Sequence, residues 1–145
     1  MNSNFDTLCA SGEVAGPASG VAINQAQEEL GVVFPTEYKT FLEEFGAVIA
    51  HGIEIYGLLE TDGVGPPLWQ DVVSVTKQLR NFKQDGAEQE SFIPISEDGT
   101  GVYFFINTEA SPNVEIWAIG PGVKKIVSNN FYDFAVKLSQ GKVTL

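Results

Sequence analysis

The residues in this sequence best suited to chemistry are its one histidine and its one cysteine, His51 and Cys9. Metal sites and catalytic triads need several such side chains at set spacings. His51 has no cysteine or carboxylate at metal-ligand spacing on a predicted helix, and the sequence contains neither a Cys-x-x-Cys pair nor a Gly-x-Ser-x-Gly motif. We therefore interpret His51 as a surface or loop-packing histidine and Cys9 as a thiol without a catalytic role.

Two pairs of adjacent glutamates, Glu28–Glu29 and Glu43–Glu44, are the next candidates for chemistry. Neighbouring residues on a helix point about 100° apart, so neither pair converges on one substrate bond. The run Gly63-Val64-Gly65 begins like a dinucleotide-binding loop, but two prolines follow where a helix should open. The sequence therefore predicts no catalytic residue, no cofactor and no metal site.

The charge of the chain is more informative than its motifs. Its 145 residues include 19 Asp/Glu and 8 Lys/Arg, which gives a net charge of −11. Most of this charge lies in the first 60 residues, where lysine occurs once and arginine is absent. Such a negative surface repels phosphate, which argues against direct nucleic-acid binding, and it attracts a basic protein.

We expect a basic partner to contact the acidic N-terminal helices and the loop that follows the first predicted strand. An exposed tryptophan beside acidic residues is typical of an interface hot spot. The candidate partner-binding residues are Glu28, Glu29, Glu37, Glu43, Glu44, Glu60, Asp62 and Trp69. A solvated helix face is the alternative for the glutamates, and core packing is the alternative for Trp69.

Hydrophobic periodicity and capping residues predict the elements that carry these side chains. Helices are expected over residues 24–30, 35–45, 72–82 and 130–140, and strands over residues 53–59, 91–96, 102–107, 114–119 and 123–127. The strand 102–106 is apolar on both faces and should be central. We expect an α+β fold with a mainly antiparallel, twisted sheet of about five to six strands and about four helices around it.

The length suits a single domain. Residues 1–15 are rich in small and polar residues and are expected to form a flexible N-terminal arm, followed by one domain over residues 16–145. The first basic residue is Lys39 and no run of 18 apolar residues occurs, so we expect no secretory signal, no membrane contact and a cytoplasmic location. A monomer or weak homodimer is expected.

The run from Ile23 to Gly46 contains an acidic helix that ends in Leu-Gly, a hydrophobic-Pro pair, Tyr-Lys-x-Phe-Leu and a closing glycine. This run resembles the opening signature of the SUKH superfamily of Smi/Knr-like domains. Phe34 stands before the proline where leucine is usual. Weaker matches follow in the order of the family, namely Ile55-Tyr-Gly-Leu58, Phe92-Ile-Pro-Ile95 with Asp98-Gly99, and the segment 130–138. The resemblance spans residues 16–140.

This resemblance implies a non-catalytic protein-binding module with the SUKH fold. Bacterial members are mainly cytoplasmic immunity proteins that neutralise polymorphic or contact-dependent toxins, many of them nucleases, and fungal relatives act in cell-wall regulation. The implied partner is a cognate toxin domain of basic charge. The alternatives are a regulatory or scaffold module of the same fold and a small Asp/Glu-dependent hydrolase, which would need convergent carboxylates.

Overall fold

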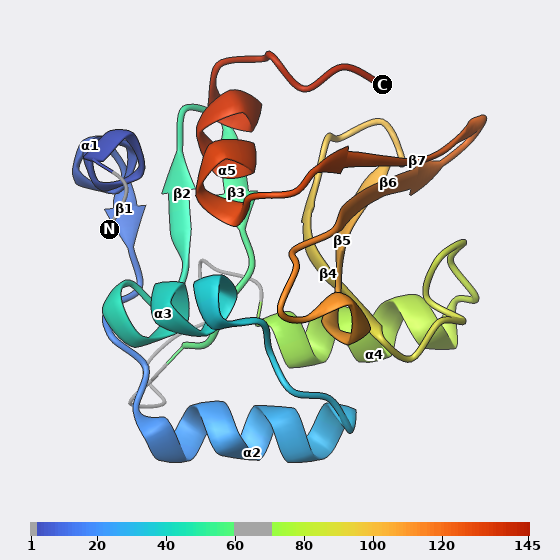
Figure 1. Ribbon diagram of the computed structural model, residues 1–145, viewed down its shortest axis with the longest axis horizontal. Helices are drawn as coiled ribbons and strands as arrows, with labels where there is room; N and C mark the ends of the chain where they lie inside the picture. The colour runs from blue at the N-terminus through green and yellow to red at the C-terminus, as the bar shows by residue number, and fades with distance from the viewer. Residues whose placement is uncertain (1–2, 60–70) are drawn as a thin grey trace.

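The computed structural model describes residues 3–59 and 71–145 of the chain (Figure 1). Over these residues it contains five α-helices, one short 3-10 helix and seven strands. In chain order they are α1 Ser3–Ser11, β1 Glu13–Val14, α2 Gly20–Leu30, α3 Thr36–Glu44, β2 Val48–Ala50, β3 Ile53–Ile55, α4 Val72–Asn81, β4 Phe92–Glu97, β5 Tyr103–Asn107, η1 Thr108–Ala110, β6 Ile116–Gly120, β7 Val123–Ser128 and α5 Phe131–Ser139.

The strands form two antiparallel sheets, one of three strands in the order β1-β2-β3 and one of four in the order β4-β5-β6-β7. The predicted α+β class is confirmed, whereas the predicted single sheet of about five to six strands is not. The difference arises because β1 and β2 have two and three residues. Strands this short leave no alternating pattern in the sequence.

The four-stranded sheet is the meander that the sequence predicts. Its inner strand β5 lies between β4 and β6, and Phe104, Phe105 and Ile106 at its centre are all buried. Both faces of this strand are therefore covered, as its continuous apolar run predicts.

The two sheets meet where β3 passes the middle of β4. The register of β4 against β5 shifts between Pro94 and Ser96. At this irregularity the backbone N–H of Tyr56 donates to the carbonyl of Ile95 at 2.8 Å, and the hydroxyl of Ser96 donates to the carbonyl of Glu54 at 2.7 Å. The bulge thus turns one β4 carbonyl toward β3 and holds the two sheets side by side.

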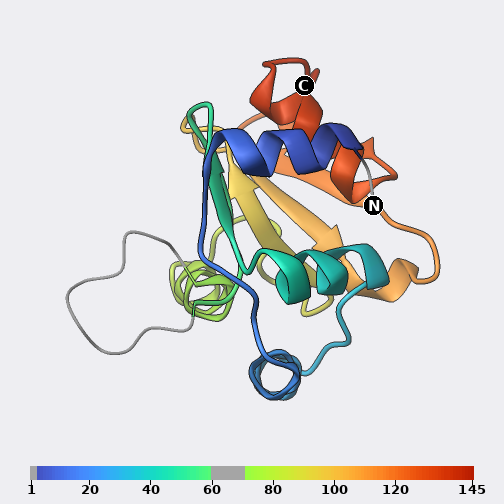
Figure 2. The ribbon, with the colours of Figure 1, turned by 90° about the vertical axis from the view of Figure 1, so that its left-hand side faces the viewer.

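The N-terminal segment differs from the flexible arm that the composition predicts. In the structure α1 packs beside α5, and β1 pairs with β2 through Val14 and Val48 (Figure 2). Phe5 has no exposed surface, and Leu8 and Cys9 are also buried. These three residues occupy one face of a helical turn, but the small and polar residues around them hide that face from a composition argument.

The N-terminal caps of α2, α4 and α5 can be compared with the helix starts that the sequence predicts. Asp71 caps α4 and Asn130 caps α5, and both helices begin close to where the sequence predicts. The N-cap of α2 is Ser19, whose hydroxyl accepts from the N–H of Ala22 at 3.1 Å, so this helix begins before residue 24, whereas the sequence predicts its start near Asn24. Both serine and asparagine are good caps, and the sequence alone does not choose between them.

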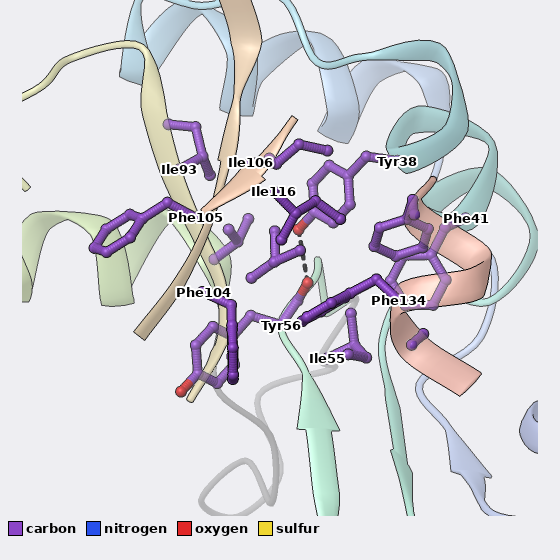
Figure 3. Close-up of a cluster of buried hydrophobic side chains, with 14 of the residues drawn as sticks. Tyr38, Phe41, Ile55, Tyr56, Ile93, Phe104, Phe105, Ile106, Ile116 and Phe134 are labelled. Carbon is purple, nitrogen blue, oxygen red and sulfur yellow. Dashed lines mark hydrogen bonds between the residues drawn. The ribbon is translucent and has the colours of Figure 1, made fainter. Parts of the chain in front are cut away.

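The core joins the helices to both sheets (Figure 3). Tyr38 is fully buried, and its hydroxyl donates to the backbone carbonyl of Tyr56 at 2.6 Å. Burial, with a smaller contribution from Asp71, raises the pKa of Tyr38. Tyr38, Phe41 and Leu42 on α3 are buried, as is Leu30 on α2, and Phe45 after α3 is half-buried. Helix α3 therefore packs its apolar side into the core.

Candidate partner-binding surfaces

The predicted acidic residues on the helices do not form one continuous group of free carboxylates. Glu28 and Glu29 are exposed at the C-terminal end of α2, while Glu37, Glu43 and Glu44 belong to α3. Their separate environments decide which of them is available to a partner.

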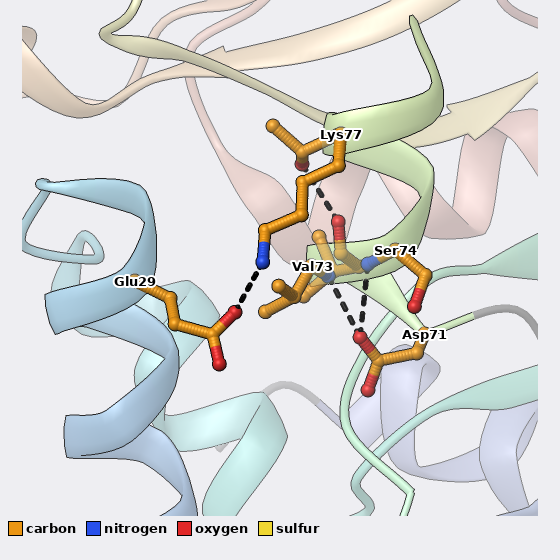
Figure 4. Close-up of polar contacts among 7 residues, drawn as sticks. Glu29, Asp71, Val73, Ser74 and Lys77 are labelled. Carbon is orange, nitrogen blue, oxygen red and sulfur yellow. Dashed lines mark hydrogen bonds and ion pairs between the residues drawn. The ribbon is translucent and has the colours of Figure 1, made fainter. Parts of the chain in front are cut away.

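Glu29 is engaged by a lysine of the neighbouring helix. Its carboxylate lies 2.7 Å from the ammonium group of Lys77 on α4 (Figure 4). Both side chains are more than half exposed, so water screens the pair and its contribution to stability is at most about 1 kcal/mol. A partner with a basic group can therefore displace Lys77 at low cost.

Glu37 has a structural role. Its carboxylate accepts from the backbone N–H of Phe131 at 2.8 Å and from the side-chain amide of Asn130 at 3.2 Å. These groups form the N-terminus of α5, where a negative charge also interacts favourably with the helix dipole. Glu37 thus ties α3 to α5, and it is half-buried rather than presented to solvent.

Glu43 and Glu44 are exposed, and the charge of Glu44 acts on Cys9 of α1 and on Tyr132 of α5. Burial raises the pKa of Cys9 to about 12, with Asp6 and Glu44 adding to the effect. At neutral pH the thiol of Cys9 is therefore protonated, which agrees with its interpretation as an unreactive residue. Asp6 and Glu44, which both act on Cys9, form a second acidic area on α1 and α3, separate from the end of α2.

The remaining predicted contacts, Glu60, Asp62 and Trp69, lie outside the described residues. Directly after them, Asp71 accepts from the backbone N–H groups of Val73 and Ser74 at 2.9 and 3.1 Å (Figure 4). This capping interaction fixes the point at which α4 begins.

His51 lies in the turn between β2 and β3 with a positive φ of 51°. Its Nε2 lies 2.9 Å from the hydroxyl of Ser11, which also donates to the carbonyl of Leu8 at 2.8 Å. Because a serine has only one hydroxyl proton, the histidine is the donor in the Ser11–His51 contact. This pair therefore links α1 to the hairpin and is not a nucleophile activated by a base.

A carboxylate-lined pocket that the sequence did not predict lies between β3, the β4–β5 turn and the segment after α5. Its volume is about 460 Å³. Glu54, Glu97 and Asp98 are the charged residues among the described residues that line it. Glu54 lies more than 40 positions before the other two, and only the contact between β3 and β4 brings them together. No local motif in the sequence could have revealed this.

Tyr56 places a hydroxyl beside these carboxylates. The residue is 2% exposed and forms part of the pocket wall. Burial is the largest cause of the raised pKa of Tyr56, and the charges of Glu97 and Glu54 add to it. Burial also raises the pKa of Tyr103, and Glu97 adds to this shift through its charge and a hydrogen bond. Both phenols therefore keep their protons at any physiological pH.

Among the described residues, no group of three or more His, Cys, Asp or Glu side chains is placed to hold a metal ion. None of the described helices is both long and apolar enough to span a bilayer.

Comparisons with known proteins give the same picture of the fold. A crystal structure of a protein from Pseudomonas syringae pv. tomato is similar with a TM-score of 0.61, at 16% identity over 86% of each chain. No curated protein matches. A model of the SUKH_5 family, described as SMI1-KNR4 cell-wall, matches residues 2–140, which includes the packed N-terminal helix. The match covers nearly the whole chain, and the protein therefore belongs to this SUKH family.

Proposed function

We propose that this protein is a non-catalytic binding module that acts as a cytoplasmic immunity protein. In this role it binds a cognate toxin domain of a polymorphic or contact-dependent system and blocks the toxin's active site or substrate path. The observation that carries the proposal is membership of the SUKH family, which includes immunity proteins. The strongly negative charge agrees with it.

The physical basis is charge complementarity. A nuclease toxin is basic because it must hold phosphate. An acidic inhibitor is attracted to the same surface, associates rapidly and competes with the nucleic acid. Glu28 on α2, Glu43 on α3 and the acidic area of Asp6 and Glu44 present exposed carboxylates for this purpose. Glu60, Asp62 and Trp69, which lie outside the described residues, stay proposed contacts.

A pull-down of the tagged protein against the polypeptide encoded immediately upstream tests the proposal. We expect a complex that weakens as salt is raised, and protection of cells that express that polypeptide. Absence of both binding and protection would contradict the immunity function.

The stoichiometry of protection separates binding from catalysis. A binding protein inhibits its target at one molecule per target, whereas an Asp/Glu-dependent hydrolase would inactivate many targets per molecule. We expect titration of the toxin activity to end at an equimolar ratio. Complete inactivation at a small fraction of that ratio would favour the hydrolase.

A regulatory module is the second candidate, because the description of the matching family refers to the cell wall. Such a module would bind a housekeeping partner through the same surfaces. If the upstream polypeptide does not bind, a changed sensitivity of deletion strains to cell-wall stress would favour this function.

A further inference from the structure

The carboxylate-lined pocket has features of a site that recognises a ligand. The ligand that we infer for it rests on the proposed function and deepens it, because it specifies which group of the partner is bound. Glu54 of β3, Glu97 at the end of β4 and Asp98 in the following turn line it together with Tyr56. No lysine, arginine or histidine is found among the described residues that line it. A cavity of about 460 Å³ falls within the size range of small-ligand sites.

The side chain of Tyr56 is almost completely buried, and its hydroxyl lies at the edge of the pocket. The residue is 98% buried, and its backbone carbonyl, not its hydroxyl, accepts from Tyr38. Over the described part of the chain, no hydrogen bond is formed by the Tyr56 hydroxyl. Figure 3 shows the Tyr56 ring beside Phe104, with the hydroxyl pointing away from the Tyr38 contact. The hydroxyl is not one of the fully buried atoms that lack a partner, so it keeps accessible surface, and a ligand in the pocket that Tyr56 lines can bond to it.

The carboxylates of the pocket differ in the hydrogen bonds that they already accept within the protein. One oxygen of Asp98 accepts from the backbone N–H and the hydroxyl of Thr100, both at 2.8 Å, and from the N–H of Val102 at 3.3 Å. Asp98 is therefore fixed in place by its own turn. Glu97 shares a hydrogen bond with Tyr103 but is half-exposed and can accept further donors. Glu97 is thus less fixed by its own turn than Asp98 and is available to a ligand.

The rest of the pocket is apolar. Phe104 and Leu138 belong to β5 and α5, and Val143 follows α5. A ligand that fits must therefore combine a cationic head with an apolar stem. Long basic side chains have this construction, because they bury their methylene groups and keep the charge at the tip.

We propose that the pocket binds one arginine side chain of the basic partner protein. The guanidinium group has five N–H donors in a planar fork, which suits acceptors on more than one side, here Glu97 and the Tyr56 oxygen. The methylene stem of the arginine packs on Leu138 and Val143, which are half-buried residues of the pocket wall. A lysine ammonium is a compact, strongly hydrated charge and has no planar fork with which to engage both acceptors at once.

The probe for this site is N-acetyl-arginine amide, titrated into the full chain and followed by NMR chemical shifts. N-acetyl-citrulline amide is the matched neutral control, because it replaces the guanidinium by a urea group of the same shape. N-acetyl-lysine amide tests the alternative cation. The variants are Glu97→Gln, which keeps an oxygen acceptor, and Tyr56→Phe, which keeps the ring. Glu109→Gln in η1 removes the same charge outside the pocket and is the control variant.

We expect saturable shifts at Tyr56, Phe104 and their neighbours with the arginine probe, and none with citrulline. Glu97→Gln should weaken binding by about threefold, Tyr56→Phe should also weaken it, and Glu109→Gln should leave it unchanged. Equal binding of citrulline, tighter binding of lysine, or shifts spread over all acidic surfaces would overturn the assignment.

The same variants separate this inference from the proposed function. If the upstream polypeptide binds the Glu97→Gln and Tyr56→Phe variants as tightly as the original chain, the pocket assignment is wrong and the immunity function stands. If the arginine probe binds the pocket but no toxin binds or is neutralised, the pocket assignment stands and the immunity function fails.

Discussion

Replacement of Phe5 by alanine tests whether the N-terminal helix is part of the folded domain. Phe5 has no exposed surface, and its ring lies within 6 Å of the rings of Phe41, Phe45, Phe131 and Tyr132. Phe41 lies on α3, Phe45 directly follows α3, and Phe131 and Tyr132 lie on α5. The side chain of Phe5 therefore links α1 to two other parts of the core. A loosely attached arm would have no such contacts.

The expected loss follows from the size of the cavity that Phe5→Ala leaves. Truncation of a buried phenylalanine costs about 3–5 kcal/mol, which combines the lost transfer free energy with the unfilled space. This is a large part of the roughly 5–15 kcal/mol that stabilises a typical domain. With a urea dependence of about 2 kcal/mol per molar, the unfolding midpoint should fall by roughly 2 M.

Urea unfolding followed by circular dichroism measures this midpoint. Thr7→Ala is the matched control, because Thr7 is an exposed residue of the same helix and its substitution should change the free energy of unfolding by about 0.5 kcal/mol or less. Phe5→Leu should cost less than Phe5→Ala, since it keeps most of the volume. Equal midpoints for the Phe5→Ala and Thr7→Ala variants would refute the docking of α1 and restore the flexible arm.

Three further predictions concern the packing and the titration of the chain. A methyl group added at Gly57 would overlap the carbonyl oxygen of Gly46, so Gly57→Ala should lower the free energy of unfolding by about 3 kcal/mol or more in the same urea assay; an unchanged midpoint would contradict this close approach. Glu37→Ala leaves the N–H of Phe131 without its acceptor and should cost about 1–2 kcal/mol, with Glu37→Gln less harmful; equal unfolding curves for the two variants would show that the carboxylate is not a cap. The pKa of Cys9 rises from 9.0 to about 12 on folding, so the unfolded state loses its thiol proton first as the pH rises. The free energy of unfolding should therefore fall as the pH rises through this window, and it should fall less in the Cys9→Ala variant. Identical pH profiles for the two proteins would contradict the burial of the thiol.

The parts of the fold that were predicted correctly depend on local signals. Asp71 and Asn130 are followed by apolar residues at helical spacing, and both cap helices in the structure. The meander of β4 to β7 consists of consecutive strands separated by turn residues such as Asp98-Gly99. Each of these elements is specified by residues only a few positions apart, and sequence patterns register such distances well.

The parts that were missed depend on contacts between distant segments. Strands β1 and β2 are two and three residues long and gain their stability from pairing, not from intrinsic propensity. The acidic pocket requires β3 to lie beside β4, which follows from the bulge near Ile95. The predicted role of Glu37 in a partner interface also took no account of α5, which lies more than 90 positions later and uses this carboxylate. No spacing rule within one helix reveals such a partner.

The total charge of −11 therefore does not describe the surface that a partner meets. Asp71 and Glu37 hold helix N-termini, and Glu29 is paired with Lys77. Exposed carboxylates act over only about 8 Å at physiological salt, so they accelerate association with any basic protein but distinguish poorly between such proteins. Carboxylates in a partly enclosed pocket interact more strongly with a cation, because less water screens them, and they also impose a shape. We thus assign fast association to the exposed carboxylates on the helices, and specific recognition to the carboxylates of the pocket around Tyr56.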